Sequence, residues 1–126
     1  MTTIPETLTA RYELLQQLGA SYDLLDSLRS TGEGTETEEA FFLAQKIESI
    51  EAELTKSEAE AKTIISQLEG DPAAWTIARL RYMQGYEWAQ AAARAGISED
   101  AAKSRVYRFF QKQHRKVRTG DKPATN

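Results

Sequence analysis

Seven lysines and arginines lie between Ala101 and Arg118, and no carboxylate interrupts them. Their cationic side chains can bind phosphate oxygens, which arginine often reaches through two parallel hydrogen bonds. A basic stretch of this density indicates a nucleic-acid surface. The alternative is a basic segment that docks on the acidic half of its own chain, and the two roles can coexist as self-masking.

A helix over residues 99–112 divides this stretch into two sides. The side predicted to be buried consists of Ala102, Val106, Phe109, Phe110 and, as its one polar member, Gln113. The other side and its flanks are mostly basic, aromatic or hydrogen-bonding, which suits a phosphate-lined groove. The simpler alternative is an amphipathic helix whose charged side is only solvated.

We expect ten residues to contact duplex DNA, and they divide by the part of the duplex they face. Ser98 stands at the start of the helix, and Gln111 lies on its outer side. Base edges in the major groove are assigned to Asp100, Lys103, Ser104 and Tyr107. Phosphates are assigned to Arg105, Arg108, Lys112 and Arg115.

Residues suited to catalysis or metal binding are scarce. His114 is the only histidine, and the neighbouring Arg115 and Lys116 disfavour its protonated form and any bound cation. Cysteine is absent, so neither a disulfide framework nor a thiolate metal site is expected. Gly32 and Gly34 lack the third glycine of a phosphate loop. We therefore expect no enzyme activity, no metal site and no cofactor.

The DNA-facing helix needs a second helix to position it, and residues 88–95 are predicted to supply one. Between the two, Gly96 can adopt the positive φ that ends the first helix. Ile97 can pack into the wedge between the helices, and the Ser98 hydroxyl can cap the second. This spacing is typical of a helix-turn-helix.

A further helix, from Pro72 to about Gln84, is predicted to brace this pair. Asp71 caps it and Pro72 occupies its first position, while Gly85 ends it. Trp75, Tyr82 and Trp88 are expected in the core rather than as a platform for stacked bases.

Three segments carry a family resemblance: Trp88-Ala89-Gln90-Ala91-Ala92, Ala95-Gly96-Ile97-Ser98 and Ala102-Lys103-Ser104-Arg105-Val106. They resemble the helix-turn-helix of sigma-factor region four. With the preceding Leu80-Arg81-Tyr82-Met83, the last 55 residues or so are similar to small phage-encoded transcriptional regulators of the ArpU-like and RinA-like kinds. The resemblance implies a DNA-binding regulator that reads the major groove with the helix over 99–112.

The charge of the 126-residue chain is divided between its halves. Residues 1–70 hold 5 Lys/Arg and 14 Asp/Glu, a net charge of −9, whereas residues 71–126 hold 11 and 5, a net of +6. No apolar run approaches the ~18 residues of a membrane span. The first 15 residues also lack the basic and apolar regions of a secretion signal. The expected location is the cytoplasm of a bacterial host cell.

The acidic half is predicted to form two helices. Leucines and tyrosines spaced by three and four from Leu8 to Leu28 indicate the first helix, and glycines and hydroxyl residues over 29–35 indicate a loop. Thr37 is expected to cap the second helix, whose apolar positions from Ala40 to Leu68 form a heptad seam. The seam can pair with the first helix as an antiparallel hairpin, or with a second copy as a homodimer through residues 40–68.

The predicted fold is therefore all-α: a helical hairpin or coiled-coil arm over 1–70, a three-helix helix-turn-helix domain over 71–116 and a disordered tail over 117–126. The expected function is DNA-binding transcription regulation. One alternative is a protein-interaction module that acts on RNA polymerase or another partner. Another is a small oligomeric DNA-packaging protein of the terminase small-subunit kind.

Overall fold

The structure, a computed structural model, describes residues 4–30 and 37–120, with side chains as far as Gln113. These residues form five helices and no strand, which confirms the all-α fold class. The helices are α1 (Glu6–Ser30), α2 (Glu38–Ser66), α3 (Pro72–Gln84), α4 (Trp88–Ala95) and α5 (Glu99–Gly120).

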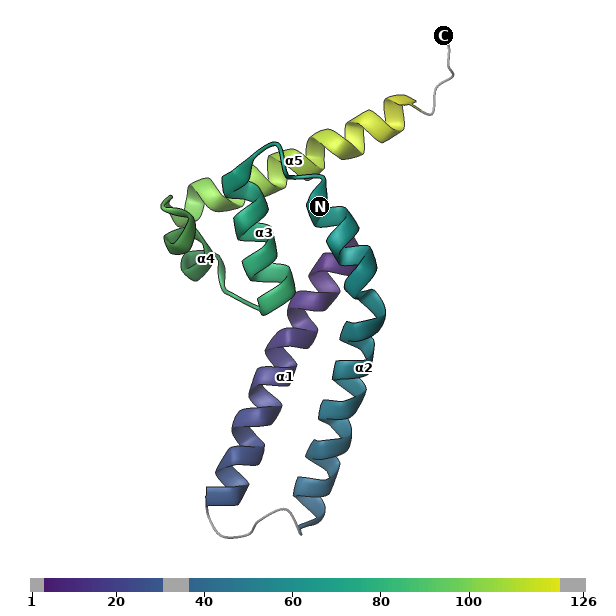
Figure 1. Ribbon diagram of the computed structural model, residues 1–126, viewed down its shortest axis with the longest axis vertical. Helices are drawn as coiled ribbons and strands as arrows, with labels where there is room; N and C mark the ends of the chain where they lie inside the picture. The colour runs from purple at the N-terminus through teal and green to yellow at the C-terminus, as the bar shows by residue number, and fades with distance from the viewer. Residues whose placement is uncertain (1–3, 31–36, 121–126) are drawn as a thin grey trace.

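The two N-terminal helices form a long antiparallel hairpin (Figure 1). Helix α2 begins at the predicted cap, where the Thr37 hydroxyl accepts a hydrogen bond of 3.1 Å from the Ala40 amide. The heptad seam is buried within the chain, at Ala40, Ile47, Ile50, Leu54 and Ala61. Of the two pairings open from the sequence, the structure has the internal hairpin.

The far end of the hairpin has a small core of its own. Leu25 packs there with Ala40 and Ile47. Two apolar residues of the same region remain exposed on the outer side of α2, Phe41 and Phe42. Tyr22 also lies outside the core, and its hydroxyl donates a 2.6 Å hydrogen bond to Glu51 of α2.

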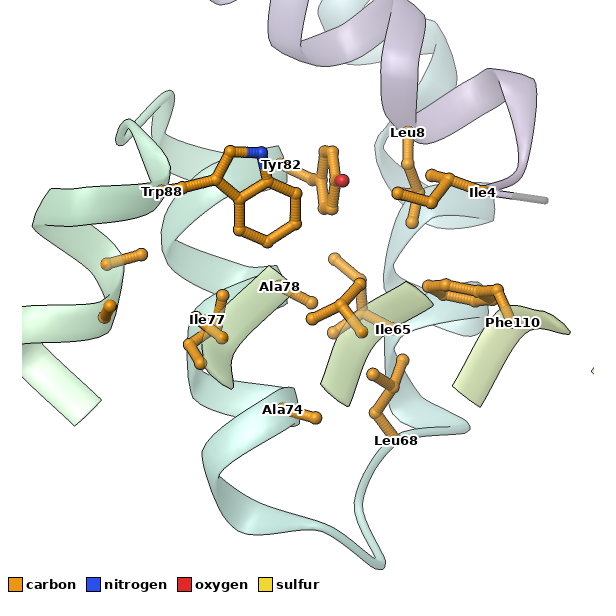
Figure 2. Close-up of a cluster of buried hydrophobic side chains, with 14 of the residues drawn as sticks. Ile4, Leu8, Ile65, Leu68, Ala74, Ile77, Ala78, Tyr82, Trp88 and Phe110 are labelled. Carbon is orange, nitrogen blue, oxygen red and sulfur yellow. The ribbon is translucent and has the colours of Figure 1, made fainter. Parts of the chain in front are cut away.

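The near end of the hairpin shares one core with the three C-terminal helices (Figure 2). Leu8 of α1 and Ile65 of α2 meet Ile77 of α3 and Phe110 of α5 there, and all four are buried. The predicted division at residues 70 and 71 coincides with a turn in the chain. The hydrophobic core nevertheless continues across this turn, so the arm and the C-terminal helices form one packed body.

A buried arginine joins the hairpin to α3. Arg11 is only 4% exposed, and its Nη1 donates to the Leu54 carbonyl and the Ser57 hydroxyl, both at 2.7 Å. Its Nε donates to the Tyr82 carbonyl at 2.9 Å, in the last turn of α3. Carbonyls in a last helical turn lack partners within the helix, so Arg11 satisfies one of them. Burial lowers the pKa of Arg11, and the charge of Glu58 partly offsets this.

Helix α5 is longer than predicted. It continues to Gly120, past residue 117 where the tail was expected to begin, and extends beyond the body of the molecule (Figure 1). Residues 121–126 of the predicted tail lie outside the described residues. Within the described part of the chain, no helix combines the length and the apolar character needed to cross a membrane.

Candidate nucleic-acid interface

The basic helix α5 is held in place by α3, whose ends are fixed as predicted. The Asp71 carboxylate accepts a 3.3 Å hydrogen bond from the Ala74 amide, and Pro72 occupies the first turn. At the other end Gly85 has φ 81°, a left-handed conformation that favours glycine. A Cβ at Gly85 would lie 3.1 Å from Cβ of Leu15, so the close contact with α1 also favours glycine.

The turn between α4 and α5 has the predicted geometry. Gly96 has φ 77°, and the Ile97 amide donates to the Ala92 carbonyl at 3.1 Å. The Ser98 hydroxyl accepts a 3.1 Å hydrogen bond from the Ala101 amide and so caps α5. Ile97 is half-buried against the shared core. These contacts fix the start of α5 relative to α4.

Helix α5 buries the predicted side. Ala102, Val106 and Phe110 lie in the shared core, with Phe109 and Gln113 half-buried at its edge. The opposite side therefore faces solvent. Five of the predicted DNA contacts occupy it at spacings of three and four: Asp100, Ser104, Tyr107, Arg108 and Gln111.

Two cations of this side have no partner among the residues that the structure describes. Arg108 and Lys112 are exposed, and neither makes an ion pair or a hydrogen bond with any other residue that the structure describes. Their charge is therefore free to meet an anion. Arg115, a further predicted phosphate contact, lies in α5 beyond the last described side chain.

Two other predicted contacts are engaged within the protein. Arg105 Nη1 lies 2.9 Å from Asp71 Oδ1, the carboxylate that caps α3. Lys103 Nζ lies 3.3 Å from Glu99 Oε2, one turn away on α5. Because both pairs are partly exposed, an incoming phosphate competes with the carboxylates for these cations. Arg105 and Lys103 are thus weaker candidates than Arg108.

The aromatic residues behind α5 form a packed set. The Tyr107 ring is 5.7 Å from the Trp88 ring and only 40% of the residue is exposed, so part of this predicted base contact is used in packing. Trp88 and Tyr82 are buried as expected, edge to face at 6.4 Å. Burial raises the pKa of Tyr82 to about 12. Trp75, expected in the core, is only half-buried, because it lies at the surface between α2 and α3.

Arg81 is a half-buried cation that was not among the predicted site residues. Its Cζ lies 3.8 Å from the centre of the Tyr12 ring and 4.2 Å from that of Trp88, so it bridges α1 and α4 through their aromatic faces. Its Nε is buried without a hydrogen-bond partner among the described residues. Its Nη1 donates a 3.4 Å hydrogen bond to the Tyr86 carbonyl, and the aromatic rings provide its other contacts. Arg81 stiffens the support beneath α4 and α5.

Helix α4 adds a cation that the predicted site did not include. Arg94 is exposed in the last turn of α4, and its Cζ lies 5.2 Å from the centre of the Tyr86 ring. The sequence could have indicated this residue, because Arg94 lies just before the predicted turn between the two helices. Within the described residues, no group of three or more His, Cys, Asp or Glu side chains is arranged to hold a metal ion.

Comparisons with protein-family models, with curated proteins and with solved structures find no match for this chain.

Proposed function

We propose that this protein binds duplex DNA through the exposed side of α5 and acts as a transcriptional regulator of the phage-encoded kind. One observation carries the proposal. Arg108 and Lys112 have no partner among the described residues, and they share an exposed helix side with the polar residues Ser104 and Gln111. Cations bind phosphates, and the polar side chains can donate to base edges.

The position of α5 supports the same proposal. In a helix-turn-helix, the helix that enters the major groove has a free outer side and a start that is held by the preceding helix. The turn over 96–98 and the buried side of α5 meet both conditions. We assign Arg94 of α4 to the phosphates that flank the groove, as an addition to the residues predicted from the sequence.

The test is a fluorescence-anisotropy titration of unrelated duplex DNA at two salt concentrations. Each phosphate contact releases about one counterion, so the affinity falls as salt rises. We expect a slope equivalent to about four to six released ions per protomer. Replacing Arg108 and Lys112 with alanine should lower the affinity and reduce the slope by about two. The matched control, Lys46→Ala with Lys56→Ala, removes the same charge from exposed positions on α2.

The acidic arm favours a second candidate, a contact with RNA polymerase or another protein. Deleting the arm would not test it, because Leu8 and Ile65 belong to the shared core. Charge reversal at exposed Glu39 or Glu53 leaves that core intact. Loss of polymerase binding in these variants, with DNA binding unchanged, would support this second role.

A further inference from the structure

An exposed aromatic pair lies at the far end of the arm. Phe41 is 59% and Phe42 is 63% exposed, and their rings pack edge to face at 6.5 Å. Burying a phenylalanine side chain is favourable, and this free energy is not gained while the two rings face water. Exposed apolar groups of this kind often mark an interaction site. Glu38 lies one turn before them and Glu48 two turns after, so the surrounding surface is acidic.

A half-open groove of about 280 Å³ lies at the other end of α2, against α3. Its apolar part is formed by Ile65, Trp75 and Met83, and its charged rim by Lys62 and Arg79, with Ser66 and Glu69 completing the lining. Arg79 lies over the Trp75 ring at 4.8 Å from its centre. Lys62 also pairs with Glu58 at 2.9 Å, at an exposed position where another carboxylate can compete for it, whereas Arg79 makes no ion pair with a described residue. The groove thus suits an aromatic side chain, with negative charge beside it on the Arg79 side.

The groove of one chain cannot receive Phe41 of the same chain. Both belong to the single helix α2, and the 24 residues from Phe41 to Ile65 span about 36 Å at 1.5 Å per residue. The two features nevertheless face a similar direction. Eight exposed positions at alternating spacings of four and three connect them along α2: Phe41, Gln45, Glu48, Ala52, Thr55, Ala59, Lys62 and Ser66.

We propose that two copies of this chain associate side by side and antiparallel along this row of eight residues. Phe41 of each copy then occupies the groove of the other, and the acidic end of one α2 meets Lys62 and Arg79 of its partner. The arrangement has two-fold symmetry, so both apolar sites are filled in a closed dimer. The midpoint between Phe41 and Ile65 falls at residue 53, where the short side chains of Ala52 and Thr55 allow the helices to approach.

This dimer differs from one through the heptad seam, which is already buried inside each chain. It uses the outer side of α2 and does not depend on the proposed DNA binding. The C-terminal helices of the two copies would lie at opposite ends of the dimer.

Sedimentation equilibrium of the full chain over a range of concentrations tests the proposal. We expect a monomer–dimer equilibrium that weakens as salt rises. Phe41→Ala removes a buried phenylalanine from both contacts and should raise the dimer Kd at least about 100-fold. Phe42 is the matched control, because it is equally exposed but turned by about 100° around the helix. Phe42→Ala should leave Kd within about threefold.

Three outcomes would overturn the proposal: a wild-type protein that stays monomeric, equal effects of the two alanine variants, or assemblies larger than a dimer. Disulfide cross-linking checks the geometry, since the chain has no cysteine of its own. Ala52→Cys places a thiol near the proposed symmetry axis, whereas Glu53→Cys places one on another side of α2. Efficient oxidation to a covalent dimer is expected for the first variant only, and equal cross-linking of both would exclude this arrangement.

Discussion

The junction of the hairpin with α3 and the outer side of α5 use arginine in opposite ways. At the junction, Arg11 is buried and its donors meet acceptors on α2 and α3, while Arg81 lies between two aromatic rings. On α5, Arg108 is exposed and unpaired among the described residues. All three residues are arginines, so residue type does not distinguish a structural cation from one that is available to a ligand. The contacts that each side chain makes within the protein do.

The largest effect is expected at Arg11. Arg11→Leu leaves the Leu54 and Tyr82 carbonyls and the Ser57 hydroxyl without this donor, and should lower the free energy of unfolding by about 3 kcal/mol. Urea denaturation followed by circular dichroism measures the change. Arg29→Leu, at an exposed position on the same helix, should have little effect. Equal stability of the two variants would contradict the structural role of Arg11.

The junction should also be sensitive to alkali through Tyr82. Its pKa is raised to about 12 because burial favours the neutral phenol, whereas in the unfolded chain it titrates near 10. The folded state therefore keeps this contribution below pH 10 and loses it as the pH rises to 12, by an amount on the order of 2 kcal/mol. Unfolding midpoints at pH 9 and 11 should differ more for the wild type than for Tyr82→Phe. The same pH dependence in both proteins would remove Tyr82 as the cause.

Arg108 should show the opposite behaviour to Arg11. Arg108→Ala is expected to lower affinity for duplex DNA about tenfold, because one charged hydrogen-bonding contact is lost. The urea midpoint should stay at the wild-type value, since no described residue pairs with Arg108. If Arg108→Ala bound DNA normally but unfolded at a lower urea concentration, Arg108 would be a structural residue and not a DNA contact.

Replacing Arg105 should have the smallest effect on stability and on DNA binding. This side chain is intermediate between the buried structural arginines and the exposed, unpaired Arg108. Its guanidinium pairs with Asp71 at 2.9 Å, but both side chains are partly exposed and the pair is screened by water. Arg105→Ala should slightly lower the urea midpoint and weaken DNA binding less than Arg108→Ala does. Asp71→Asn tests the link, because it releases Arg105. If the ion pair limits DNA binding, Asp71→Asn should increase the affinity.

Local signals in the sequence were sufficient to predict the five helices of the described residues and several of their ends. Thr37, Asp71 and Ser98 accept the capping hydrogen bonds expected of them, and Gly85 and Gly96 have positive φ. Each of these signals acts over a few residues, as does the periodicity that identified the buried side of α5. The C-terminal end of α5 has no such signal before Gly120, and the helix runs on past residue 117.

Contacts between distant residues could not be predicted in this way. Arg11 lies on the apolar side of α1, three residues after Leu8 and four before Leu15, but this spacing does not indicate its partners, which lie 43 to 71 residues away. The pairing of Arg105 with Asp71 spans 34 residues, and no local pattern indicates it. Apart from Ser98, which caps it, the predicted DNA-contacting residues therefore lie on α5 as expected. Which of their charges are free to bind DNA depends on ion pairs such as that of Arg105 with Asp71, which form only in the folded chain.

The most direct measurement is the salt-dependent titration of duplex DNA with three proteins: wild type, Arg108→Ala with Lys112→Ala, and Lys46→Ala with Lys56→Ala. We predict that the wild type and the α2 control bind with similar affinity and a similar salt slope. The α5 variant should bind at least about tenfold more weakly with a slope lower by about two. Equal binding by all three proteins, or no binding by the wild type at low salt, would contradict the assignment of α5 as a DNA-binding surface.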